Sequence, residues 1–108
     1  MKKIKNESIK KNVEELRERI KVISEDIEER STKDRIIYKS TVTFAAIYTQ
    51  KNQFWFGAKL PKGQVKKQFR QLDVRPHKDE AFTHIRCNNN AKIEDLVSLA
   101  EQAYENTL

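Results

Sequence analysis

The residues best suited to chemistry are a run of cations that follows the only tryptophan of the chain. Lys and Arg side chains bind phosphate groups, and an indole ring stacks on nucleic-acid bases. This combination predicts a nucleic-acid-binding surface around the tryptophan and the segment 59–78. The candidate residues are Trp55, Lys59, Lys62, Lys66, Lys67, Arg70, Arg75 and Lys78.

Trp55 has a second interpretation. It alternates along a predicted strand with Phe54 and Phe56, so its ring points to the face opposite theirs. If the first or last predicted helix covers that face, Trp55 packs beneath it and the lysines are only solvated charge. We favour this burial for Trp55 and leave the role of the lysines open.

Catalytic chemistry has less support in the sequence. Cys87 and His84 are three residues apart in a predicted strand, so their side chains point to opposite faces and form no dyad. We expect Cys87 to be a small buried residue. No phosphate-binding glycine loop is present. One group of potential metal ligands matches no established spacing: His77, Asp79, Glu80 and His84. We therefore predict no metal and no cofactor, favour a non-catalytic role, and leave enzyme activity open.

The charge of the chain is uneven. The net charge is +6, and residues 31–86 hold twelve Lys and Arg against four Asp and Glu. A section this basic favours a polyanionic partner such as nucleic acid or anionic lipid. It also fits a surface whose charge only keeps the protein in solution.

The length of 108 residues fits a single domain over 1–108, with a frayed basic end at residues 1–7. One cysteine excludes an internal disulfide. The N-terminus lacks the pattern of a signal peptide, and no apolar run approaches the ~20 residues that span a bilayer. We therefore expect a cytoplasmic protein that does not contact a membrane.

A helix is predicted near the N-terminus, over about residues 9–24. Six apolar residues recur there at steps of three and four, which places them on one stripe: Ile9, Val13, Leu16, Ile20, Ile23 and Ile27. The stripe fits a helix that covers a sheet, and it also fits a short coiled-coil seam. We favour the first use.

Strand-like alternation dominates the segment 35–60. Two predicted strands are joined by the polar residues 50–52, which predicts an antiparallel hairpin. We expect one further strand before the hairpin and another at FTHIRCN. A short basic helix follows Pro61, and an amphipathic helix ends the chain. The fold class is therefore predicted as α+β. We expect an antiparallel sheet of three to four strands, with an N-terminal and a C-terminal helix packed on it and the short basic helix between strands 3 and 4.

Three segments carry a family resemblance: EERSTKDRIIYK, the aromatic hairpin ending in KLPKG, and the terminal helix with QAY. Together they resemble an uncharacterised bacterial and archaeal domain family often labelled "predicted transport protein". Such domains occur alone or fused to restriction-type nucleases, which implies an accessory role in nucleic-acid transactions. Family members carry a Gly-His-Trp-Gly-like turn before the last strand, whereas RPHKDEAFTH here has neither Trp nor Gly. More distantly, the element order is similar to the double-wing MmcQ/YjbR-like fold, for which DNA binding has been suggested.

Three functional hypotheses follow. The first is a non-catalytic nucleic-acid-binding or nuclease-associated module that uses the basic surface. The second is a protein–protein interaction module with no nucleic-acid contact. Its partner is another protein, or a second copy that pairs through the stripe of the first helix or through a sheet edge. The third is a ligand binder or small enzyme, which would need a pocket lined by residues such as Tyr48, Trp55 and His84.

Overall fold

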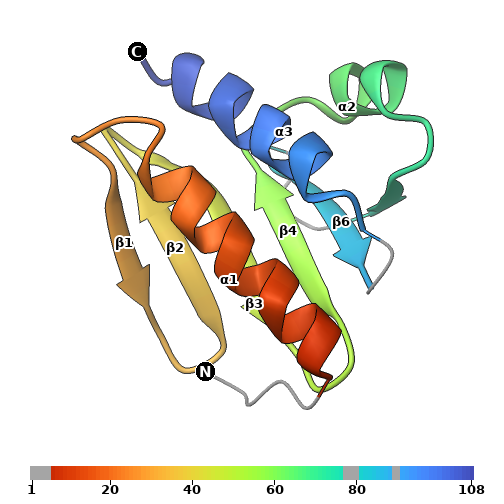
Figure 1. Ribbon diagram of the computed structural model, residues 1–108. Coiled ribbons are helices and arrows are strands. Elements are labelled where there is room, and N and C mark those ends of the chain that lie inside the picture. The colour runs from red at the N-terminus through yellow and green to blue at the C-terminus, as the bar shows by residue number, and fades with distance from the viewer. Residues whose placement is uncertain (1–5, 77–80, 89–90) are drawn as a thin grey trace.

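The computed structural model describes residues 6–76, 81–88 and 91–108. Three helices accompany a six-stranded antiparallel sheet of strand order β1-β2-β3-β4-β6-β5 (Figure 1). The elements are α1 (Glu7–Lys21), β1 (Glu28–Ser31), β2 (Arg35–Lys39), β3 (Thr43–Thr49), β4 (Phe54–Ala58), α2 (Lys62–Gln68), β5 (Asp73–Arg75), β6 (Thr83–Cys87) and α3 (Ile93–Glu105).

Helix α1 covers the sheet with its apolar stripe. The Asn6 side chain caps the helix by accepting hydrogen bonds from the backbone of Ser8 and Ile9, at 2.9 and 3.2 Å. Four of the six stripe residues lie on α1 and are buried within the chain: Ile9, Val13, Leu16 and Ile20. Ile23 and Ile27 follow the helix, which ends at Lys21, and are partly buried against the core. A coiled-coil seam on this stripe would compete with that burial, so the structure favours the intramolecular use.

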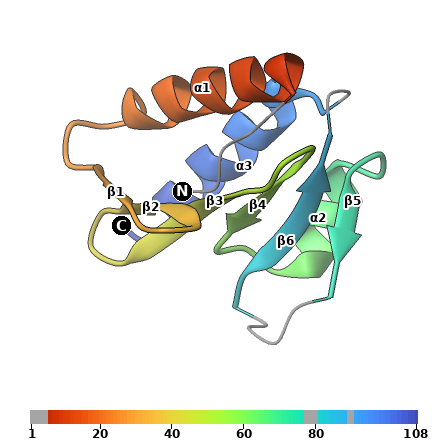
Figure 2. The same cartoon turned by 90° about the horizontal axis from the view of Figure 1, so that it is seen from below.

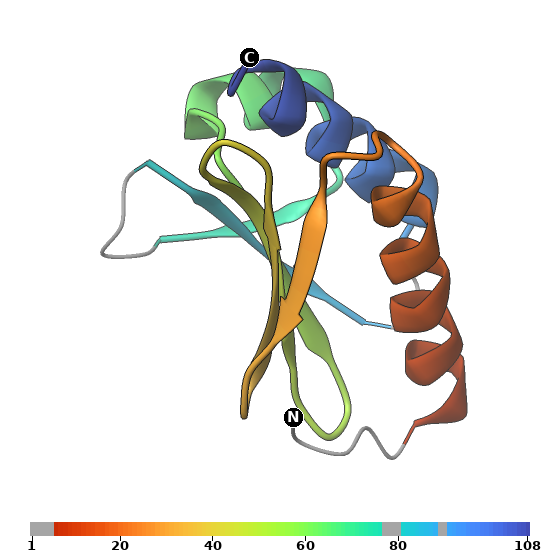
Figure 3. The ribbon, with the colours of Figure 1, turned by 90° about the vertical axis from the view of Figure 1, so that its left-hand side faces the viewer.

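Helices α1 and α3 lie on the same side of the sheet, as Figure 2 and Figure 3 both show. They bury a row of side chains that crosses five strands in register: Ile36, Ile47, Phe56, Ile85 and Val74. The stripe of α3 completes this core with Leu96, Leu99 and Ala100. One face of the sheet is therefore a helix-covered core.

The predicted sheet of three to four strands is wrong, because two further strands pair at the edges. Strand β1 pairs with β2, and β5 pairs with β6. The segment EERS of β1 has no apolar residue, and Val74 is the one apolar residue among the three of β5. Both strands are held by backbone pairing at an edge, which produces no apolar alternation in the sequence. The short basic helix is α2, which ends at Gln68 and lies between β4 and β5 in the chain.

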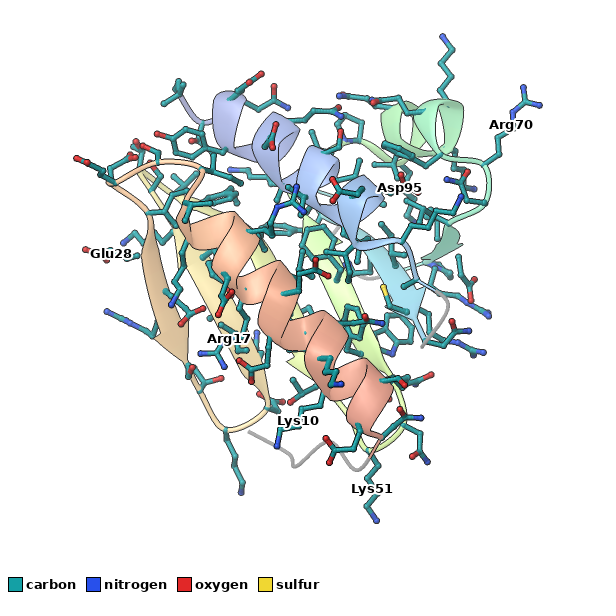
Figure 4. The ribbon with its side chains drawn as sticks, in the orientation of Figure 1. Lys10, Arg17, Glu28, Lys51, Arg70 and Asp95 are labelled. Carbon is teal, nitrogen blue, oxygen red and sulfur yellow. The ribbon has the colours of Figure 1, made fainter. Side chains whose placement is uncertain are left out.

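Two carboxylates fix the connection between α1 and the sheet. Glu29 of β1 accepts hydrogen bonds from Arg17 at 3.1 Å and from the Tyr38 hydroxyl at 2.7 Å. Figure 4 shows Arg17 extending from α1 toward β1 and β2. Asp26, in the loop after α1, accepts hydrogen bonds from Ser24, from Ser40 at 2.6 Å and from Tyr104 at 2.7 Å. Asp26 thereby links the loop to the β2–β3 turn and to α3.

Substitution of Ile20 tests the role of the α1 stripe. Ile20 is fully buried in the core, whereas the nearby Val22 is 79% exposed. We expect Ile20→Ala to lower the free energy of unfolding by about 2–5 kcal/mol, because it leaves a cavity under α1. Val22→Ala is the control and should change it by less than about 0.5 kcal/mol. Equal effects in urea denaturation would show that the stripe is not part of the core.

The hydrogen bonds to Asp26 predict a pH dependence of stability. Those from Ser24, Ser40 and Tyr104 lower the pKa of Asp26 from its ordinary value of 3.8 to about 2. Its stabilising contribution is therefore present above about pH 4 and is lost as the pH falls toward 2. Asp26→Asn should lower the thermal midpoint at pH 7, and its difference from the natural protein should shrink toward pH 2. The exposed neighbour Glu25 provides the control, Glu25→Gln. A difference for Asp26→Asn that stays constant with pH would contradict this assignment.

Candidate functional site

The face of the sheet opposite α1 and α3, here called the open face, collects the side chains that alternate with the core. One row in register consists of Arg35, Tyr48, Trp55, Arg86 and Asp73. A second row consists of Arg30, Ile37, Ala46, Gly57, His84 and Arg75. In Figure 3 helix α1 lies to the right of the sheet and the open face is on its left. The end of β5 and the start of β6 project toward that same side.

Aromatic rings gather over the centre of the open face. The rings of Tyr48 and His84 have centroids 5.6 Å apart, and Phe82 lies 6.3 Å from His84. Gly57 makes this arrangement possible. A Cβ at this position would lie 3.2 Å from His84 Nε2 and 3.5 Å from Tyr48 Cε2. The absence of a side chain lets the two rings approach the backbone of β4.

Two hollows lie beside this ring pair. The first hollow has a volume of about 310 Å³ and is lined by Arg35, Ile37, Thr43, Ala46, Tyr48, Phe82 and His84. The second hollow has a volume of about 200 Å³ and is lined by Tyr48, Gln50, Trp55 and His84. Both contain Tyr48 and His84, so this ring pair separates them. The second hollow contains the three residues that the ligand-binding hypothesis named.

Arginines surround the rings. The Arg35 guanidinium lies 5.6 Å from the centre of the Tyr48 ring, within the range of a cation–π contact. Arg86 is paired in register with Trp55, and Arg75 with His84. Asp73 forms ion pairs with Arg75 at 2.8 Å and with Arg86 at 3.6 Å. Because these arginine side chains are nearly half exposed, they remain available to a phosphate.

The predicted site residues divide into two groups. Trp55 and Arg75 lie on the open face, so the favoured packing of Trp55 beneath a helix is wrong. Lys59 is half-buried directly after β4. The other described cations of the set belong to α2 or the turn after it: Lys62, Lys66, Lys67 and Arg70. Lys78 lies outside the described residues.

Helix α2 lies at one end of the sheet, against α3. Gln64 and Gln68 donate hydrogen bonds to Gln102 of α3, at 2.9 and 2.8 Å. Figure 4 shows Arg70 extending away from the rest of the chain. A hollow lined by Lys66, Phe69, Arg70, Leu72, Asp73 and Val74 connects α2 to β5. The basic helix therefore adjoins the edge of the open face without being part of it.

Sequence reasoning missed Arg35, Arg86 and Phe82. Period-two alternation within a strand was an available signal. It does not relate residue 35 to Tyr48, which share a face through the register of β2 with β3. The pairing of Arg86 with Trp55 depends on the register of β4 with β6, which no local pattern specifies. Phe82 precedes β6 and reaches the cluster through its contact with His84.

Cys87 behaves as the sequence predicted. It is buried on the core side of β6, and burial raises the pKa of its thiol to about 12. His84 lies on the opposite face of the same strand. Within the described ranges, no group of three or more His, Cys, Asp or Glu could hold a metal ion. His77, Asp79 and Glu80 lie outside those ranges. No helix among the described residues is long and apolar enough to cross a membrane.

The chain belongs to the family described as "Domain of unknown function (DUF5655)", which matches residues 3–107. No curated protein and no solved structure matches it. The family assignment covers nearly the whole chain and leaves function to be argued from the open face.

Gly57 provides a test of the ring arrangement. We expect Gly57→Val to lower the free energy of unfolding by about 1–3 kcal/mol, because the new methyl groups meet His84 and Tyr48. Gly63→Ala, in α2, is the control, since a Cβ there meets no atom within 4 Å. The control should stabilise the protein by up to about 1 kcal/mol. If both variants are stabilising in chemical denaturation, the rings do not require the glycine.

Proposed function

We propose that this protein is a nucleic-acid-binding module whose contact surface is the open face of the sheet. The observation that carries the proposal is the combination of aromatic rings and arginines on the sheet face opposite the helices. Tyr48 and Trp55 supply rings in the same row as Arg35 and Arg86. Rings stack on bases, and guanidinium groups bind phosphates.

The distribution of charge supports the same surface. By register, the strand residues of the open face include five cations and two carboxylates: Arg30, Arg35, Lys39, Arg75 and Arg86 against Glu28 and Asp73. Helices α1 and α3 together carry five Lys and Arg against eight Asp and Glu. Arg19 forms an ion pair with Glu94 at 2.6 Å, and Arg17 forms one with Glu29 at 3.1 Å. A polyanion is therefore attracted to the open face more than to the helices.

The cations of α2 extend this surface at one end of the sheet. The hollow that contains Lys66, Arg70 and Asp73 lies between the helix and β5. A nucleic-acid backbone that leaves the open face past β5 would meet Lys66 and Arg70. We assign these residues to phosphate contacts without sequence preference.

The resemblance to modules associated with restriction-type nucleases supports an accessory, non-catalytic role in the cytoplasm. In that role the module binds nucleic acid while a separate nuclease carries out cleavage.

The second candidate is self-association through a sheet edge. Strand β1 is an edge strand, and one of its sides is paired with β2. Glu28 and Arg30 are exposed on it, and charged residues on an edge strand disfavour the addition of another strand. For this reason nucleic-acid binding is our first proposal. Sedimentation of the free protein separates the two, since edge pairing predicts a dimer.

Salt-dependent binding tests the proposal. We expect the protein to bind nucleic acid at low salt, with an affinity that falls linearly with salt on logarithmic axes. Arg35→Gln combined with Arg86→Gln should reduce the magnitude of that slope by about 1.4 for a single strand, about 0.7 for each lost phosphate contact. Fluorescence anisotropy with a labelled oligonucleotide measures both quantities.

Two further variants locate the contact. Lys10→Gln combined with Lys11→Gln removes the same charge from the exposed side of α1 and should leave the slope unchanged. Replacing Lys62, Lys66, Lys67 and Arg70 by Glu should weaken binding without removing any preference for bases. Absence of binding at low salt to every single-stranded and double-stranded DNA and RNA would refute the proposal.

A further inference from the structure

The two hollows of the open face are divided by a pair of rings. Tyr48 and His84 line both hollows, and the Tyr48 hydroxyl lies 3.5 Å from His84 Nε2. The first hollow continues to Phe82, and the second continues to Trp55. Each hollow therefore has its own aromatic wall in addition to the shared pair.

The rings are recessed. His84 is only 3% exposed, and Tyr48 and Trp55 are half-buried. A base must leave its helical stack to reach such rings. In a duplex the bases are stacked inside and the backbone is outside, whereas a single strand can turn its bases toward a protein surface. The recess therefore selects against a duplex.

A phosphate-binding group stands at the first hollow. Arg35 lines it and lies over Tyr48, and its side chain is 46% exposed. Its neighbour Asp34 is 3.6 Å away, so the cation is partly compensated and retains solvent-facing donors. The second hollow contains Gln50, whose side-chain amide accepts a hydrogen bond from Gln53 at 2.5 Å. Its amide can pair with the edge of a base.

These observations rest on the proposed function and deepen it. We infer that the open face binds single-stranded nucleic acid with two consecutive bases, one in each hollow, on opposite sides of the Tyr48–His84 pair. Phe82 stacks on the first base and Trp55 on the second. Arg35 binds the phosphate adjoining the first base. Phosphate contacts by the α2 cations add affinity and do not distinguish bases.

The test compares three oligonucleotides of about eight nucleotides, a length within the usual site size of single-strand binders. They are a single strand with bases, an abasic single strand with the same phosphates, and a duplex of the same sequence. Each is titrated as DNA and as RNA, with anisotropy of a label as the readout. The strand with bases should bind at least about 5-fold more tightly than the other two. Trp55 is the only tryptophan, so quenching of its fluorescence reports stacking in the second hollow.

Variants separate the hollows from the remaining surface. Phe82→Leu and Tyr48→Leu should each weaken binding of the strand with bases by about 5- to 150-fold, the effect of losing a stacked base. Neither should change binding of the abasic strand. Tyr104→Leu is the matched control, because Tyr104 lies on α3 and lines neither hollow. Similarly, Arg35→Gln should weaken binding more than Lys39→Gln on the same strand. Circular dichroism and thermal midpoints verify folding, and Phe82, which lies outside the strands, carries the test if Tyr48→Leu does not fold.

Each outcome has a distinct meaning. Equal affinity for the strand with bases and the abasic strand would overturn the base sites and leave phosphate binding by the proposed function intact. Tighter binding of the duplex would also overturn the base sites. If none of the three oligonucleotides binds at low salt, the proposed function fails and this inference fails with it.

Discussion

The burial of one face of the sheet is the constraint on which the rest of the structure depends. Both long helices, α1 and α3, pack on the row that contains Ile47, Phe56 and Ile85. Successive side chains of a strand point to opposite faces of the sheet, so the residues on either side of each core residue lie on the open face. Helix packing therefore determines which side chains are left for a partner. Gly57 adds a local condition, because it lets Tyr48 and His84 lie close to the sheet.

Much of the core could be predicted from periodicity. The α1 stripe and the β3–β4 hairpin have strong local patterns, since their apolar residues recur at helical or strand spacing. The edge strands could not be predicted in the same way. Strand β1 is entirely polar, and its Glu29 is fixed by distant partners, Arg17 and Tyr38. Strand β5 has three residues that follow a helix-like segment. These edge strands pair through backbone hydrogen bonds with a neighbouring strand. The local amino-acid composition does not reveal such pairing.

The candidate site could be predicted only in part. The residue types were visible in the sequence, and the structure places the half-buried Trp55 on the open face. Which face Trp55 occupies depends on where the helices lie, and this is a tertiary property. The pairing of Arg86 with Trp55 is equally a consequence of register between strands separated by a helix. The α2 cations were prominent in the sequence because they are consecutive, yet they lie at the end of the sheet.

The most direct test of the open face is a map of amide chemical shifts by NMR while a single-stranded oligonucleotide is added. We expect the largest changes in β3, β4 and β6, including the Trp55 indole and the amide of Gly57. Amides on the outer sides of α1 and α3 should change little. Changes confined to those helices, or to α2 alone, would contradict the assignment of the open face as the binding surface.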